Sequence, residues 1–159
     1  MKKLFICMLA LLSMTANSQD YIMMSRTRPI IDVEINGHRA AMLIDTGSEL
    51  TLLSKSILGV INAEKHITKI SAIGVDGMIN IWEVEDCSLS VKGVNVTSIH
   101  ATNLDATCES IEERTGIRVV GILGTPAIKE LGMIIDLSRG IVRSEERRVG
   151  KECLRLCRS

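Results

Sequence analysis

The residues best suited to chemistry form the tetrapeptide Asp-Thr-Gly-Ser at positions 45–48, directly after three apolar residues. A carboxylate that follows an apolar strand is held at the strand end, where the chain turns. Gly47 permits close approach of the backbone, and Thr46 and Ser48 offer hydroxyl and amide groups that can hydrogen-bond a carboxylate. We therefore expect Asp45 to be held in a fixed orientation for acid–base chemistry. Taken alone, the same four residues also fit a polar turn between two strands.

Two further segments accompany this tetrapeptide. Ile122-Leu123-Gly124 leads into a short stretch with helical features at residues 125–131, and Gly74-Val75-Asp76-Gly77 separates two β-like runs. Together with AMLIDTGSELTLLS at residues 41–54, these segments resemble retropepsin-like aspartic proteases. They stand in the order active-site motif, flap hairpin, then hydrophobic pair and glycine. The resemblance covers about residues 28–142.

The resemblance implies a mostly β, closed-barrel-like acid-protease fold with one short C-terminal helix, active as a homodimer. It also implies a peptide or protein substrate, held as an extended strand beneath the flap by backbone hydrogen bonds. Thr46, Gly47 and Ser48 would orient Asp45 and line the cleft, and residues 122–124 would support the site. No metal ion or organic cofactor is implied.

Peptide hydrolysis by this route uses a water held between two carboxylates that share one proton, because two charges so close cannot both ionise cheaply. The chain has one Asp-Thr-Gly, and residues 19–143 are too few for the two-lobed, single-chain form of the family. The second carboxylate is therefore expected to be Asp45 of another subunit, related by a two-fold axis. A non-catalytic peptide-binding module with the same fold and a fragment of a longer polypeptide are the alternatives.

Other aspartates are weaker candidates for the second carboxylate. Asp136 also follows an apolar strand, but it lacks the Thr-Gly that would orient it, so we expect it to cap the Ser-Arg-Gly turn that follows. Asp32 is expected to be a solvated strand residue, and Asp76 a turn residue at the flap tip.

The chain departs from the family pattern in two places. Many relatives have Asp or Asn two positions after the glycine that follows the hydrophobic pair, and Pro126 stands there in this chain. A hydrogen bond that supports the site is therefore expected to be missing. The flap also has no aromatic residue, which leaves contacts with the substrate to aliphatic side chains such as Val75 and Met78.

The segments that must position Asp45 are short strands. Residues 30–35 alternate with period two, Asn36-Gly37 is a strong hairpin signal, and residues 39–44 return as an apolar strand that ends at Asp45. Further β-like runs occupy residues 67–73, 78–84, 88–91, 94–99, 119–123 and 133–137. Short, closely spaced strands predict a compact and mostly antiparallel β domain.

One helix is expected at residues 126–131. Thr125 can cap it, Pro126 suits its first position and Gly132 ends it.

Composition excludes several classes of protein. The 159 residues are 46% hydrophobic and 24% charged, which fits neither a disordered chain nor a multi-span membrane protein. The formal charge is zero overall, with 12 basic and 16 acidic residues at positions 19–143, so no nucleic-acid partner is expected. Aromatic residues make up 2%, so the core must be aliphatic.

The N-terminal segment, residues 1–18, has the features of a secretory signal peptide. Lys2 and Lys3 precede an apolar run at residues 4–12, and small residues end the segment at Ser18. The apolar run is much shorter than the ~20 residues that span a bilayer. We expect cleavage after Ser18, export to the periplasm or the extracellular space, and no membrane span after cleavage.

The protease-like domain is expected at residues 28–142, preceded by a linker at residues 19–27. Residues 143–159 (RSEERRVGKECLRLCRS) resemble a vector-derived read-through sequence and are expected to be a non-native tail. A metal or redox motif at Cys153 and Cys157 is the less favoured interpretation, because no partner His or Cys pair lies nearby.

Cysteine and histidine residues give no metal site. Cys87 and Cys108 are the two cysteines of the domain, and they fit either one disulfide or two separate buried thiols. His38, His66 and His100 lie in separate segments without the spacing of metal ligands, so we expect surface or strand histidines.

Overall fold

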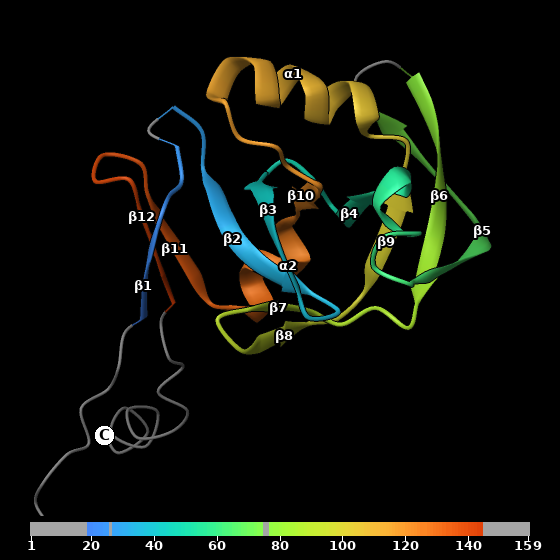
Figure 1. Ribbon diagram of the computed structural model, residues 1–159, viewed down its shortest axis with the longest axis horizontal. Coiled ribbons are helices and arrows are strands. Elements are labelled where there is room, and N and C mark those ends of the chain that lie inside the picture. The colour runs from blue at the N-terminus through green and yellow to red at the C-terminus, as the bar shows by residue number, and fades with distance from the viewer. Residues whose placement is uncertain (1–18, 26, 75–76, 145–159) are drawn as a thin grey trace, which may run out of the picture.

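Figure 1 shows the computed structural model, which describes residues 19–25, 27–74 and 77–144. The strands are β1 (Gln19–Ile22), β2 (Ile30–Ile35), β3 (His38–Ile44), β4 (Thr51–Ser54), β5 (Glu64–Gly74), β6 (Gly77–Glu85), β7 (Leu89–Val91), β8 (Val94–Val96), β9 (Ile99–Thr102), β10 (Gly121–Leu123), β11 (Met133–Asp136) and β12 (Ile141–Ser144). The helices are the 3-10 helix η1 (Lys55–Ile57), α1 (Asp105–Thr115) and α2 (Thr125–Glu130).

Most strands join one large sheet. Its order is β5-β6-β9-β4-β10-β3-β2-β7-β8, and a smaller sheet has the order β1-β12-β11. Neighbouring strands run antiparallel except for the pairs β3–β10 and β4–β9, which run parallel. This architecture confirms the predicted mostly β fold.

The β2–β3 hairpin delivers the chain to Asp45. Asn36 and Gly37 form the turn with positive φ angles of 47° and 80°, which suit the right-handed twist of the two strands. The side chain of Asn36 also donates to the carbonyl oxygens of Ile61 and Asp86 and accepts from the backbone N–H of Ser88. The turn is therefore tied to two distant segments, and the register of the hairpin is fixed at its closed end.

The two faces of the large sheet pack against different layers. On β2 and β3 the alternating side chains of Ile31, Val33, Met42 and Ile44 enter the main apolar core, which also includes Ala127 of α2. The side chains on the opposite face join a smaller cluster with α1, formed by Ile30, Ala41, Ile111 and Val119. The helices α1 and α2 therefore cover opposite faces of the sheet (Figure 1).

The sequence did not predict α1. Its segment is polar along most of its length, and Ile111 is its one buried residue among the eleven. Because one residue is buried, the segment lacks the regular spacing of apolar residues by which a helix is predicted. Its formation depends on packing against the sheet beneath it.

Several helix and strand boundaries differ from the sequence predictions; for example, β5 covers residues 64–74 rather than 67–73, and β10 covers residues 121–123 rather than 119–123. The expected strand at residues 94–99 is two strands, β8 and β9, because Ser98 has a positive φ of 60° and Glu130 accepts hydrogen bonds from the backbone and side chain of Thr97. The expected cap of α2 was wrong. Gly124 is the N-cap, and Thr125 lies in the first turn.

The smaller sheet joins the two ends of the described chain. Gln19–Ile22 were expected in a linker but form β1, which pairs with β12, and β12 extends across the expected boundary at residues 142 and 143. On its other side, β12 pairs with β11. Among the described residues β11 has no strand on its second edge, so that edge is open.

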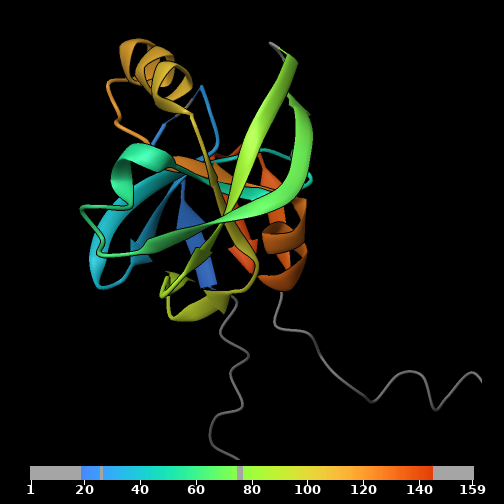
Figure 2. The ribbon, with the colours of Figure 1, turned by 90° about the vertical axis from the view of Figure 1, so that its right-hand side faces the viewer.

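The β5–β6 hairpin projects from the end of the large sheet. Figure 2 shows the tip of this hairpin and α1 as two separate projections at the same end of the molecule. Within the described residues no helix is long and apolar enough to cross a membrane.

Candidate active site

Asp45 lies one residue beyond the end of β3, between the middle strands of the large sheet. Its backbone N–H donates to the carbonyl oxygen of Leu123 on β10, at 3.0 Å. Because β3 and β10 run parallel, both carry their C-terminal ends to the same place. The side chain of Asp45 is neither buried nor fully exposed, as an acid–base group that must meet a substrate requires.

The turn that follows holds the Asp45 carboxylate. The backbone N–H of Gly47 donates to Oδ1 of Asp45 at 2.8 Å, and the N–H of Ser48 donates to the carbonyl oxygen of Asp45 at 3.2 Å. The hydroxyl of Ser48 donates to the carbonyl oxygen of Leu50 instead of the carboxylate. Neither the hydroxyl nor the amide of Ser48 therefore binds the carboxylate, in contrast to the expectation, and the amide of Gly47 does so.

Gly124 supports this turn by close backbone packing. A Cβ atom on Gly124 would lie 2.2 Å from the carbonyl oxygen of Leu50 and 2.9 Å from that of Ser48. No side chain fits there, so the glycine of Ile122-Leu123-Gly124 is required by contact with the loop that follows Asp45. On the same strand, Leu123 is fully buried in the core and Ile122 is half-buried on the opposite face.

The first turn of α2 gives a contact that the sequence reasoning missed. The backbone N–H of Thr125 donates to the carbonyl oxygen of Ser48 at 2.8 Å, and its hydroxyl donates to that of Thr46 at 2.9 Å. Pro126 has no amide hydrogen and no polar side-chain atom. Pro126 therefore cannot donate the expected supporting hydrogen bond to the loop. Thr125, one position earlier, donates two hydrogen bonds to the loop instead. The sequence shows the hydroxyl of Thr125, but a threonine directly before Pro126 predicts a helix cap rather than a contact with a distant loop.

The flap residues are brought together only in part. Gly74 and Gly77 face each other at the end of the β5–β6 hairpin, whereas Val75 and Asp76 lie outside the described residues. The next pair, Ile73 and Met78, is 87% and 77% exposed. Two large apolar side chains side by side in water favour contact with a further surface.

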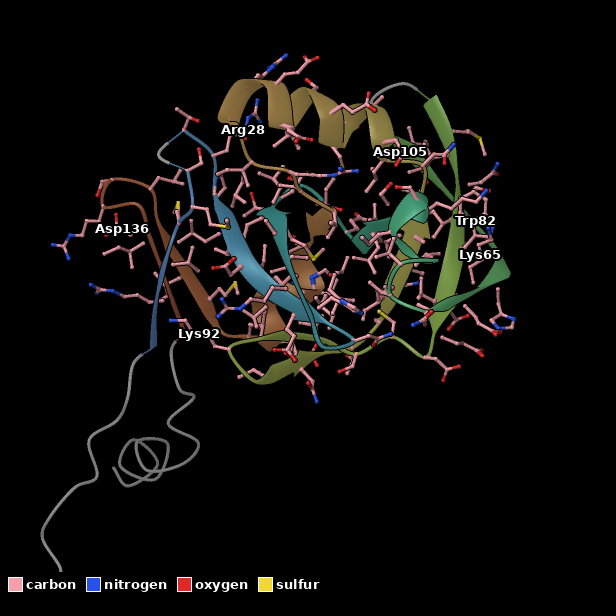
Figure 3. All side chains as sticks on the ribbon, viewed as in Figure 1. Arg28, Lys65, Trp82, Lys92, Asp105 and Asp136 are labelled. Carbon is pink, nitrogen blue, oxygen red and sulfur yellow. The ribbon has the colours of Figure 1, made fainter. Side chains whose placement is uncertain are left out.

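Asp136 and Asp32 take the structural roles expected for them, and Asp76 lies outside the described residues. Oδ1 of Asp136 accepts hydrogen bonds from the hydroxyl and backbone N–H of Ser138 and from the N–H of Arg139, which caps the turn. These bonds lower the pKa of Asp136, with the Ser138 hydroxyl contributing most. Figure 3 shows Asp136 on the opposite side of the molecule from Trp82 and Lys65. Asp32 is an exposed residue of β2.

Both cysteines of the domain are free, so the structure has two separate thiols rather than a disulfide. Cys108 lies on α1 and is half-buried, and burial is the main reason that its pKa rises from 9.0 to about 11. The carboxylate of Asp105 raises it further.

The three histidines lie on different strands. His38 begins β3 and is exposed, and His66 on β5 is paired with Glu85, with Nε2 of His66 3.2 Å from Oε2 of Glu85. His100 on β9 is buried. No group of three metal-ligating side chains is found in the described ranges.

A cavity of about 270 Å³ lies beneath α1, lined in part by Ser54, Ser56, Asp105 and Cys108. The hydroxyls of Ser54 and Ser56 donate to Oδ1 of Asp105 at 2.5 and 2.6 Å. These bonds, with that of Ser54 first, lower the pKa of Asp105. The cavity is at the end of β4 that is remote from Asp45.

A mostly β fold with an Asp-Thr-Gly-Ser turn at the end of a central strand defines the class of retropepsin-like aspartic proteases. The family model described as gag-polyprotein putative aspartyl protease matches residues 31–130, so the chain belongs to this family. Among solved structures, the EIAV protease complexed with the inhibitor HBY-793 matches 69% of this chain and 92% of its own, with a TM-score of 0.53 and 20% identity. That likeness shows the fold. A comparison with curated proteins gives no match.

Proposed function

We propose that the chain is an aspartic endopeptidase whose active site forms from two copies of Asp45 in a homodimer. The geometry of Asp45 supports this proposal most directly, because the carboxylate is partly exposed at a central strand end and held by the amide of Gly47. One carboxylate would accept a proton from the attacking water. The second, protonated carboxyl would donate a hydrogen bond to the scissile carbonyl oxygen.

The open edge of β11 supports pairing of two protomers. The strand has one partner, β12, and its other edge is unpaired among the described residues. Ile134 is 44% exposed on β11, and Leu137 is 68% exposed in the turn after it. An open edge flanked by exposed apolar side chains favours addition of another strand, and a second β11 related by a two-fold axis provides one.

A peptide substrate would lie between the Asp45 loops and the β5–β6 hairpins. Ile73 and Met78 would then cover the peptide, which would remove two exposed apolar side chains from water. The peptide would bind in an extended conformation, and its backbone would form hydrogen bonds with the protein.

The N-terminal residues support a further proposal, that the domain acts after export to the periplasm or the extracellular space. Lys2, Lys3 and the apolar run at residues 4–12 form a signal-peptide pattern. Expression of the full chain in a bacterial host, followed by fractionation and N-terminal sequencing, tests this. An exported protein that begins at Gln19 supports it, and a chain that keeps Met1 in the cytoplasm contradicts it.

The decisive experiment compares the protein with its Asp45→Asn variant. We expect the wild-type protein to be dimeric by mass and to cleave members of a peptide library, with inhibition by a transition-state-mimicking inhibitor of aspartic proteases. Asp45→Asn should lower kcat/KM by at least about 1000-fold, since neither acid nor base can act. Its mass should stay that of the dimer. Asp32→Asn, at an exposed position of β2, is the matched control and should keep full activity.

Cleavage that persists in Asp45→Asn contradicts the mechanism. A protein that is strictly monomeric and binds peptides without cleaving them is instead a peptide-binding module with the same fold.

A further inference from the structure

One row of side chains crosses the large sheet next to Asp45. Leu43 on β3 pairs with Ile122 on β10, Ile122 pairs with Leu52 on β4, and Leu52 pairs with His100 on β9. Residues that pair directly across strands point to the same face. Ile44 and Leu123, the next residues along, enter the main core. The row therefore lies on the opposite face, and it starts two residues before Asp45.

This row is apolar from Leu43 to Leu52 and ends in a buried imidazole. His100 is 8% exposed and Leu52 is 7% exposed, yet Leu52 belongs to neither apolar cluster. Nδ1 of His100 is buried and has no hydrogen-bond partner in the described part of the chain. A buried polar atom without a partner destabilises the folded protein, and a leucine of similar size would avoid that cost.

We propose that His100 is a specificity-determining residue whose imidazole hydrogen-bonds the carboxamide side chain of a Gln or Asn in the substrate. This inference rests on the proposed peptidase function, because the row flanks the strand that ends at Asp45. The substrate would supply the partner that the imidazole lacks in the free protomer. Rotation of the imidazole about the Cβ–Cγ bond exchanges the positions of Nδ1 and Cδ2. The unpaired nitrogen therefore has two positions from which it could meet the substrate.

The neighbours of His100 select the chemistry of this side chain. Glu83 on β6 pairs with His100 across the strands and is exposed, so its negative charge disfavours an acidic side chain nearby. Leu52, which pairs with His100 on its other side, favours a substrate side chain whose aliphatic part is uncharged. A carboxamide both donates and accepts, so it can pair with either tautomer of a neutral imidazole.

The distance along the row limits which substrate residue is recognised. Three strand spacings separate Leu43 from His100, or about 14 Å at the usual spacing. An extended peptide advances about 3.4 Å per residue. The recognised side chain would therefore lie within about four residues of the scissile bond, over β4 and β9.

Kinetics on matched peptides test the proposal. A peptide library on the wild-type dimer first identifies the positions that favour Gln or Asn, and two peptides that differ only by Gln or Leu at that position are then compared. We expect wild-type kcat/KM to favour the Gln peptide by at least about tenfold, in line with the cost of an unpaired polar group. In His100→Leu the ratio should fall to about one. In His66→Leu, which replaces the exposed histidine of β5, the ratio should stay at the wild-type value.

A second measurement leaves His100 in place. The imidazole ¹⁵N shifts of His100 in the Asp45→Asn dimer should change with the Gln peptide and not with the Leu peptide. A wild-type enzyme that cleaves peptides without a carboxamide preference, or a preference that survives His100→Leu, overturns the role of His100 while leaving the peptidase intact. If His100→Leu does not fold, unchanged ¹⁵N shifts with both peptides overturn it. If no peptide is cleaved at all, the proposed function fails, and ¹⁵N shifts still decide whether His100 binds a carboxamide.

Discussion

The hydroxyl of Thr125 donates a hydrogen bond to the carbonyl oxygen of Thr46 at 2.9 Å, which joins the first turn of α2 to the loop of Asp45. The backbone N–H of Thr125 holds the carbonyl oxygen of Ser48 in the same loop. Two carbonyl groups of the tetrapeptide are therefore directed away from the carboxylate. The amide of Gly47 is left to face Oδ1 of Asp45.

Replacing Thr125 by Val should weaken this support. The variant keeps the shape and the backbone N–H but loses the donor to Thr46, so we expect a loss of about 1 kcal/mol in the free energy of unfolding. We also expect a several-fold lower kcat with little change in KM, because the loop of Asp45 loses a restraint. Urea unfolding and steady-state kinetics measure both. Thr125→Ser keeps the hydroxyl and should restore kcat, and a Val variant equal to wild type would show that the bond is incidental.

The strands that position Asp45 could be predicted because their signals are local. The Asn36-Gly37 turn and the alternation along residues 30–35 specify β2 and β3 within a short span. The role of Thr125 could not be predicted, since its partner Thr46 is 79 positions away in the chain and a threonine before a proline fits a helix cap equally well. The pairing of β1 with β12 joins opposite ends of the described chain, and no local pattern records it.

The thiol of Cys108 should be slow to alkylate in the folded protein. Its pKa of about 11 leaves roughly 100-fold less thiolate at pH 8 than a cysteine with a pKa of 9.0, and partial burial slows the reagent further. Iodoacetamide labelling at pH 8, followed by mass spectrometry of the peptides, should show at least that difference between the folded and the urea-unfolded protein. Labelling at equal rates in both states contradicts the prediction, and no labelling in urea without reductant would reveal a disulfide.

Asp105 should make stability depend on pH in the acid range. Hydrogen bonds from Ser54 and Ser56 lower its folded-state pKa below 3.8, so its contribution is present above that value and is lost as the pH falls through the folded pKa. Because the carboxylate is exposed, we expect Asp105→Asn to cost only about 0.5 kcal/mol at pH 7. Urea midpoints at pH 7, 5 and 3 should show the difference from wild type shrinking at pH 3. A difference that is constant with pH, or one equal to that of the exposed Asp32→Asn, would exclude this role.

The open edge of β11 should be the surface that joins two protomers. Ile134→Lys places a charge on a side chain that is 44% exposed in the protomer, and burial of that lysine against a second copy would be costly. Val94→Lys on β8 is a matched control, because Val94 is equally exposed and lies on the strand at the far end of the large sheet. We expect Ile134→Lys to shift the mass in solution from dimer to monomer and to lower peptide cleavage in proportion, while Val94→Lys leaves both unchanged. Cleavage should recover at higher protein concentration, since only association is weakened. A monomeric Ile134→Lys protein with full activity would show that one Asp45 is sufficient, whereas a dimer that resists the substitution would move the interface away from β11.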